Sequence, residues 1–296
     1  MAKSSSQHRF HFGRRECVEE TGPWRFITKR IFEAADKEKS IWSSRHHRKH
    51  LRVSLESYTV LPALNWVDLV WFPKRLNWWI GVVFSIGALL FLLGSAFSLD
   101  STAMREMSSW RMTVAVTFFV GSLFFTTAAY LQLFQTVNAG EFSLARKRGS
   151  KKKILFGWHP RDIGWLSSAL QLVGTLWFNL NTFDGMLPAV GWVRQDLLLW
   201  FPDTIGSVFF LVSGRLAFAE TCHKRWGWQP RNISWWVVFS NLLGCAAFMI
   251  AALMSVSLPF PVASWLSVGS VIFTLIGSVG FLVGSLLMLP ESTSSY

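Results

Sequence analysis

The sequence predicts an all-α polytopic membrane protein: a bundle of six transmembrane helices, arranged as three tandem parallel hairpins, behind a basic N-terminal segment. Three observations lead to this fold class. The 296-residue chain is 51% hydrophobic and rich in Trp and Phe, six segments are apolar over the roughly 20 residues that a bilayer span needs, and short motifs recur between them. The formal charge of +12 would also suit a nucleic-acid-binding protein, but its distribution along the chain argues against that class.

The N-terminal segment, residues 1–77, opens polar and basic and has no early apolar run typical of a signal peptide. Apolar residues then recur at helical spacing with basic residues between them, which predicts an amphipathic helix lying on the membrane surface. This pattern is carried by Trp24, Ile27, Ile31, Phe32 and Ala35. The alternative is that this helix packs on the cytoplasmic face of the protein itself. Tyr58–Phe72 is apolar but shorter than a span, so we expect it at the interface.

Six segments satisfy the length and polarity of a transmembrane helix. They are Trp78–Leu99, Met112–Thr136, Ile163–Phe183, Leu197–Phe218, Ser234–Val256 and Ser264–Leu289. Paired in order, they form hairpins over residues 78–136, 163–218 and 234–289, joined by loops 137–162 and 219–233 and followed by the tail 290–296. Pro202 lies near the start of the fourth segment, where the first turn of a helix tolerates proline.

The orientation follows from Lys and Arg in the short loops. The two loops between hairpins contain ten of these residues, whereas the loops within hairpins contain only Arg105, Arg111 and Arg194. The sequence therefore predicts a multi-pass protein of the cell membrane with both termini in the cytoplasm. Tryptophans at or near the ends of the segments are consistent with these boundaries, because amphipathic rings favour the interface.

A glycine motif recurs in all three hairpins. The first helix carries Gly-x-x-x-Phe, beginning at Gly87, Gly174 and Gly244, and the second carries Gly-Ser, at Gly121-Ser122, Gly206-Ser207 and Gly277-Ser278. The two glycines of a hairpin are 34, 32 and 33 residues apart. Small residues let helix backbones approach closely in lipid, so we expect these glycines at helix–helix contacts. The repeats are parallel, unlike the inverted repeats of many secondary transporters.

The Gly-Ser helix and two longer stretches resemble the bacterial YrhK-like domain, a small two-helix membrane module. The stretches are Trp200-Phe201-Pro202-Asp203-Thr204-Ile205-Gly206-Ser207-Val208-Phe209-Phe210-Leu211-Val212-Ser213 with the following Glu220, and Gly174-Thr175-Leu176-Trp177-Phe178-Asn179. The resemblance covers residues 78–289. It implies a multi-span hairpin architecture, and because the family has no established activity it implies no catalytic residues.

Polar residues inside a span are costly and are candidates for function. Asp203 lies three residues before Gly206, where the other hairpins have Phe118 and Thr274. It could bind a cation or a proton. The alternative, which we favour, is that Asp203 stabilises the positive N-terminal end of the helix that Pro202 begins.

Amides mark the first helices of the second and third hairpins. Gln171 and Asn241 occupy equivalent positions, three residues before their glycines, and Gln171 shares a helix face with Asn179. These side chains could line a pathway through the membrane. We favour interhelical hydrogen bonds, each worth about 0.6–2 kcal/mol.

Two basic clusters are candidates for contact with anionic lipid headgroups. The first contains Arg45, Arg48 and Lys49, and the second contains Arg146, Lys147, Arg148, Lys151, Lys152 and Lys153. His46 and His50 are one helical turn apart, but the surrounding cations disfavour a divalent metal ion, so we expect no metal site.

No catalytic motif, phosphate-binding loop or cofactor-binding motif occurs in the sequence. The sequence therefore favours a membrane protein without enzymatic activity or cofactor, acting as a structural or accessory component of an assembly. Its expected partners are the lipid bilayer and either another membrane protein or further copies of the chain. The alternative function is a small transporter or channel that uses the polar groups of the middle hairpin.

Overall fold

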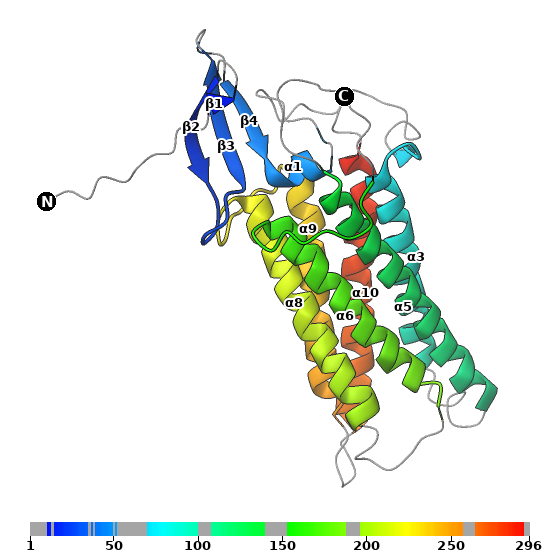
Figure 1. Ribbon diagram of the computed structural model, residues 1–296. Coiled ribbons are helices and arrows are strands. Elements are labelled where there is room, and N and C mark those ends of the chain that lie inside the picture. The colour runs from blue at the N-terminus through cyan, green and yellow to red at the C-terminus, as the bar shows by residue number, and fades with distance from the viewer. Residues whose placement is uncertain are drawn as a thin grey trace, which may run out of the picture.

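A computed structural model shows a long helical bundle with a small β-sheet at one end (Figure 1). The structure describes residues 11–12, 15–34, 37, 39–49, 51, 70–99, 108–139, 153–187, 196–256 and 264–292. We call the end of the bundle beside the sheet the sheet end, and the opposite end the far end. Of the predicted interfacial segment Tyr58–Phe72, residues 58–69 lie outside the described residues.

The described residues include six long helices, one for each predicted span. These are α3 (Leu76–Ser98), α5 (Ser108–Val137), α6 (Ile163–Asp184), α8 (Phe201–Cys222), α9 (Ile233–Met254) and α10 (Ser264–Glu291). A five-residue π-helix, η1 (Asp196–Trp200), leads directly into α8. Each helix overlaps the apolar segment that predicts it, because the run of apolar side chains sets the length of the helix.

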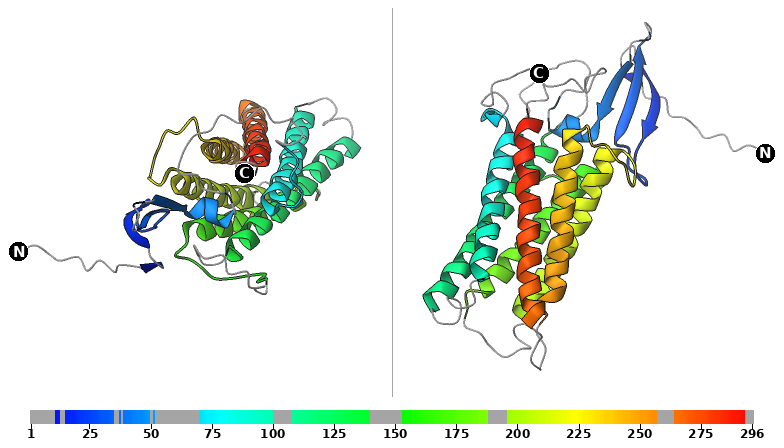
Figure 2. Two further views of the ribbon diagram at one scale, coloured as in Figure 1. Left: turned by 90° about the horizontal axis from the view of Figure 1, so that it is seen from above. Right: turned by 180° about the vertical axis from the view of Figure 1, so that it is seen from behind.

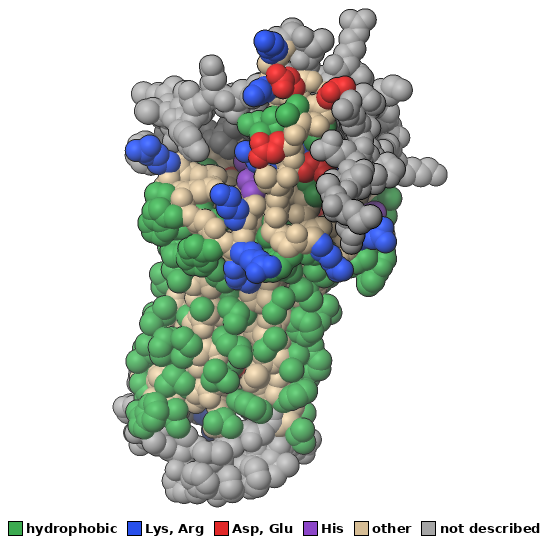
Figure 3. All heavy atoms as spheres, turned by 90° about the vertical axis from the view of Figure 1, so that its left-hand side faces the viewer, with side chains coloured by type: hydrophobic (Ala, Val, Ile, Leu, Met, Phe, Trp, Pro, Cys, Tyr) green, Lys and Arg blue, Asp and Glu red, His purple; other side chains and the backbone are tan. Residues whose placement is uncertain are grey.

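Five of the six helices, as described, are long and apolar enough to cross a membrane, and α6 is the exception. Gln171, Asn179 and Asn181 lower the hydropathy of α6. Apolar side chains cover the lateral surface of the bundle, and Lys and Arg gather where the bundle meets the sheet (Figure 3). The chain is therefore a multi-pass membrane protein.

The six helices form a closed ring. Each packs extensively on two neighbours, in the order α3, α5, α6, α8, α9, α10 and back to α3. The views from above and behind show the first and last helices of this ring side by side (Figure 2). The ring therefore has a central axis, toward which every helix directs one face.

The motif glycines lie at the closest approach of the two helices of each pair. A Cβ atom added at Gly87 would be 3.1 Å from the Gly121 carbonyl oxygen, and one at Gly174 would be 3.1 Å from that of Gly206. The third pair repeats this contact, with 3.0 Å between a Cβ at Gly244 and the Gly277 oxygen. The serines that follow the second glycine are fully buried; they are Ser122, Ser207 and Ser278. Small residues thus bring each pair of backbones into contact.

The first helix of each pair also begins in the same way. The indole nitrogens of Trp78, Trp165 and Trp235 donate to the carbonyl oxygen eight residues earlier, at 2.6, 2.7 and 2.9 Å. A second Trp, seven residues earlier, meets each ring edge to face; these are Trp71, Trp158 and Trp228. The side chains of these three second tryptophans are 61–79% exposed. Three exposed indoles at the sheet end are typical of a membrane interface.

The predicted amphipathic helix in residues 24–35 is wrong, because this region belongs to an antiparallel sheet. The sheet has the order β1 (His11–Phe12), β2 (Arg15–Thr21), β3 (Lys29–Ala34) and β4 (Lys39–Ser43). The chain turns between β2 and β3, where a Cβ at Gly22 would collide with the Phe26 carbonyl oxygen. β3 pairs with β2 on one side and with β4 on the other, and this pairing makes it a strand. Phe32 of β3 is buried, at 1% exposed.

Candidate functional site

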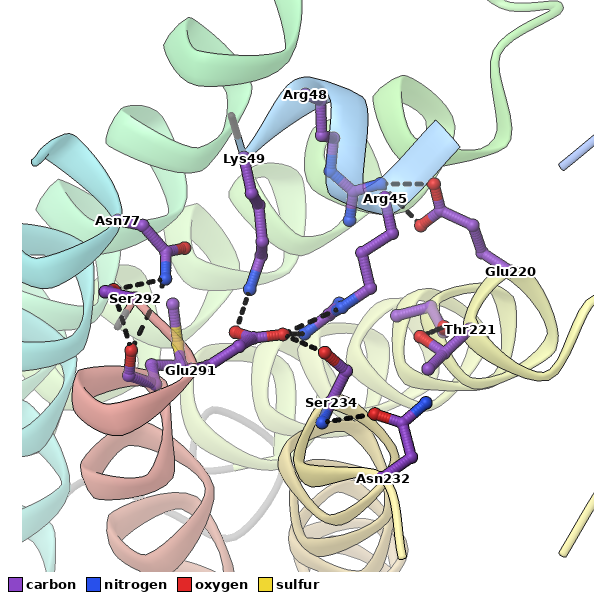
Figure 4. A network of polar contacts seen from close by, with 12 residues as sticks. Arg45, Arg48, Lys49, Asn77, Glu220, Thr221, Asn232, Ser234, Glu291 and Ser292 are labelled. Atoms are coloured by element: carbon purple, nitrogen blue, oxygen red, sulfur yellow. Dashed lines mark hydrogen bonds and ion pairs between the residues drawn. The ribbon is translucent and has the colours of Figure 1, made fainter. Parts of the chain in front are cut away.

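A cluster of buried charges closes the sheet end of the bundle. Directly after β4, the short helix α1 (Ser44–Arg48) carries three cations into the bundle, which meet two carboxylates at the ends of α8 and α10 (Figure 4). Arg48 forms an ion pair with Glu220, to which Ser44 also donates at 2.7 Å. All of these side chains are at most 10% exposed.

Glu291 is the second carboxylate of this cluster. It accepts from Arg45 Nη2 at 2.9 Å, from Lys49 Nζ at 2.6 Å and from Ser234 Oγ at 2.7 Å. Its side chain is fully buried. Helix α1 is thus joined to α8 by one ion pair and to α10 by two, with Ser234 adding the start of α9.

A glycine makes room for this cluster. A Cβ atom added at Gly164, near the start of α6, would collide with the Arg48 guanidinium and lie 3.1 Å from Glu220 Oε1. The α6 backbone is anchored at this point by Asp162, whose carboxylate accepts from the Gly164 and Trp165 N–H groups. This cap holds the glycine in place beside the ion pair.

The predicted contact with anionic lipid is wrong for Arg45, Arg48 and Lys49. These side chains are 4%, 8% and 7% exposed and their charges meet carboxylates inside the protein. Their partners lie 172 to 246 residues away in sequence, so no local pattern could assign them. Of the second basic cluster, Lys153 is exposed, and Arg146, Lys147, Arg148, Lys151 and Lys152 lie outside the described residues.

Burial acts on the ionisable groups of α1 in different directions. Desolvation by burial, and next to it Arg45, lower the pKa of Lys49 to about 7, although Glu291 opposes the change. Burial would also lower the pKa of Arg48, but Glu220 raises it above its ordinary value. Burial lowers the pKa of His46 as well. Lys49 is therefore the cation of the cluster whose charge is least well compensated.

A polar cavity of about 60 Å³ lies on the axis of the ring directly beneath α1. Arg45, Arg48 and Lys49 form one wall. Neutral polar side chains form much of the remainder; they include Gln132, Gln135, Ser167, Gln171, Ser213 and Asn241. The two amides that occupy equivalent positions in the sequence, Gln171 and Asn241, thus come together here. A cavity of this size and polarity holds roughly four water molecules.

Six phenylalanines separate this cavity from the far end. One comes from each helix, four residues after each motif glycine; they are Phe91, Phe125, Phe178, Phe210, Phe248 and Phe281. Within the helix pairs their ring centroids lie 4.9–5.2 Å apart, and contacts of 5.8–5.9 Å join one pair to another. We call this set the phenylalanine layer. It closes the axis of the ring midway along the bundle.

A larger cavity of about 350 Å³ lies on the other side of the phenylalanine layer, toward the far end. Phe91, Phe178 and Phe248 form its floor. Asp203 and Thr274 line it, together with Asn181 and Arg111. The positions three residues before Gly121, Gly206 and Gly277 therefore all face this cavity, and only the middle one is acidic.

Asp203 lies in the first turn of α8 beside Pro202, as the sequence predicts, so its carboxylate is near the positive end of that helix. The π-helix η1 runs directly into this turn. The Asp203 side chain is also hydrogen-bonded to Ser255, and its stabilising role at the helix end stays a prediction. Asn179 behaves as expected for an interhelical contact, because it is hydrogen-bonded to Thr126 of α5.

Glu220 and Glu291 were not among the predicted site residues. A signal for them exists in the sequence, since each follows a motif glycine by 14 residues: Glu220 follows Gly206 and Glu291 follows Gly277. The same position in the first pair is Gln135, which is 5% exposed and lines the sheet-end cavity. Among the described residues, no group of three or more His, Cys, Asp or Glu side chains could hold a metal ion.

A comparison of the chain with models of protein families, with curated proteins and with solved structures finds no match.

Proposed function

We propose that the bundle conducts small ions across the membrane along the axis of the helix ring. One observation carries this proposal: two cavities, each with polar or charged groups in its lining, lie on that axis toward opposite ends of the bundle, with the phenylalanine layer between them. A purely structural component has no need of cavities lined by amides and charges, which are costly within a membrane. A narrow apolar layer between two wet cavities is a known form of gate, because water leaves it readily.

The pathway requires six spans, and we propose α6 as the sixth. Helix α6 lies between α5 and α8 in the ring, so its polar groups face protein and cavity. Because these groups avoid lipid, α6 tolerates a lower hydropathy than its neighbours. On this arrangement both chain termini are cytoplasmic, as the charges of the short loops favour.

We further propose that the three helix pairs are copies of one hairpin. The shared glycine contacts, tryptophan turns and phenylalanine pairs support this proposal. Two-helix copies fit the resemblance to the YrhK-like domain, which rests on the residues quoted above. The absence of a catalytic motif from the sequence favours conduction rather than catalysis.

The proposed conduction is tested with purified protein in liposomes loaded with potassium chloride. Release of potassium and of chloride is measured with ion-selective electrodes after dilution into an isosmotic solution. We expect release faster than from protein-free liposomes. Gln171→Phe should abolish the difference, because the ring would fill much of the sheet-end cavity that Gln171 lines.

Val173→Phe is the matched control, since Val173 lies two residues further along α6 and is 39% exposed on the outer surface. It should conduct like the natural chain. Release no faster than from empty liposomes, or equal effects of the two substitutions, would leave the structural role as the better interpretation.

The proposed orientation predicts the labelling of single cysteines in intact cells. A cysteine at position 187, beyond the end of α6, should react with a membrane-impermeant maleimide added outside. One at position 150 should react only after the cells are opened. The reverse pattern would contradict the orientation and place the sheet end outside.

A further inference from the structure

The charges buried at the sheet end do not balance. While Lys49 is protonated, below its lowered pKa of about 7, Arg45, Arg48 and Lys49 contribute three positive charges, and Glu220 and Glu291 contribute two negative charges. All five side chains are at most 10% exposed. Asp162 is near enough to act on Arg48, but it is exposed and already caps α6, so water screens it. Among the described residues, one positive charge therefore remains without a buried counter-charge, which is costly.

The sequence repeat shows where a third carboxylate would balance this charge. Glu220 and Glu291 each stand 14 residues after a motif glycine, and the corresponding residue of the first pair is the neutral Gln135. All three residues are buried at the sheet end. A third carboxylate at Gln135 would make the cluster neutral within the chain itself.

The cavity beneath α1 offers the groups that bind an anion. The three cations form part of its wall, beside amide and hydroxyl groups that can donate hydrogen bonds. Among the described residues that line it, no carboxylate occurs. Its volume of about 60 Å³ suits an ion of a few atoms and is too small for a lipid headgroup.

We infer that the sheet-end cavity binds one small inorganic anion of single charge, such as chloride or nitrate, which neutralises the buried cluster of α1. That the conducted ion is an anion rests on the proposed function. That the cavity binds an anion rests only on the charge balance and on the lining of the cavity. The phenylalanine layer then lies beyond this site on the path to the far end.

The binding is tested on the purified full-length chain in an uncharged detergent. The melting temperature is followed as sodium gluconate is replaced by sodium chloride or sodium nitrate at constant ionic strength. Because gluconate is too large for the cavity, we expect the melting temperature to rise with the concentration of either small anion. Replacing sodium by potassium should have no effect.

Two substitutions remove the excess charge in opposite ways. Lys49→Gln deletes one cation, and Gln135→Glu supplies the third carboxylate. Each should weaken the apparent affinity for chloride by about tenfold or more, and each should raise the melting temperature in gluconate. Arg225→Gln is the matched control, because it removes one exposed positive charge at the same end of the bundle and should keep the affinity.

The inference fails if the natural chain gains no stability from chloride or nitrate. It also fails if either folded variant keeps the affinity of the natural chain. Having two variants keeps the test decisive if one of them does not fold. Binding without release of ions from liposomes would uphold this site and contradict the proposed conduction, whereas release of potassium alone would uphold the conduction and contradict an anion as the conducted ion.

Discussion

The Glu291→Ala variant should lose about 3–5 kcal/mol of unfolding free energy, the range expected when one partner of a buried ion pair is removed. The physical reason is that Arg45 and Lys49 both direct their charges at Glu291, and their side chains are only 4% and 6% exposed. Truncation leaves two buried cations with no carboxylate. The measurement is denaturant unfolding of the purified protein in detergent.

Glu20→Ala serves as the control for this prediction. Glu20 pairs with Arg30 at 2.9 Å across strands β2 and β3, but its side chain is 39% exposed. Its loss should cost at most about 1 kcal/mol. If both variants unfold alike, the buried cluster does not hold α1 in place. A triple variant, Arg45→Met, Lys49→Met and Glu291→Leu, should recover much of the lost stability, because it removes the charges together.

The Phe248→Ala variant should conduct ions at least about tenfold faster than the natural chain. Phe248 holds the phenylalanine layer together, since its ring contacts Phe91, Phe178 and Phe281. Removing it joins the two cavities through the gap and lets water enter the apolar layer. Ion release from liposomes measures the effect.

Phe239→Ala controls for the damage that any large truncation causes. Phe239 lies on the same helix but stacks on Trp235, away from the phenylalanine layer. Both variants should be less stable, by up to about 3–5 kcal/mol for the fully buried ring, yet only Phe248→Ala should conduct faster. Equal conduction by the two variants would mean that the phenylalanine layer is not the barrier.

The chain reveals its helices more readily than its N-terminal region. Each predicted span overlaps a helix, because a membrane helix is recognised from a continuous apolar run. The helix predicted for residues 24–35 is wrong, since Trp24, Ile27 and Ile31 happen to fit a helical spacing. This region forms strands because residues from separate segments pair, such as Glu20 of β2 with Arg30 of β3. The side-chain pattern of one segment does not reveal such pairing.

The candidate site divides in the same way. Gln171, Asn241 and Asp203 were identified as polar residues within spans, and all three line cavities. For Asp203 the choice between the two roles stays a prediction, because the residue lies both in the first turn of α8 and in the lining of the far-end cavity. Asn179 is identified as readily, yet it forms a hydrogen bond between helices. An amide within a span can thus either line a cavity or form a hydrogen bond between helices, and the neighbouring helix decides which.

By itself, the sequence determined the membrane class, the approximate positions of the helices and the glycines at which paired helices touch. Each of these depends on side chains close together in the chain, where apolar length and small size act directly. Only the tertiary structure decided that the helices close into a ring, that their phenylalanines meet on its axis and that α1 is buried. These features join residues such as Arg45 and Glu291, 246 positions apart, and their energy comes from burial and charge pairing that exist only once the chain has folded.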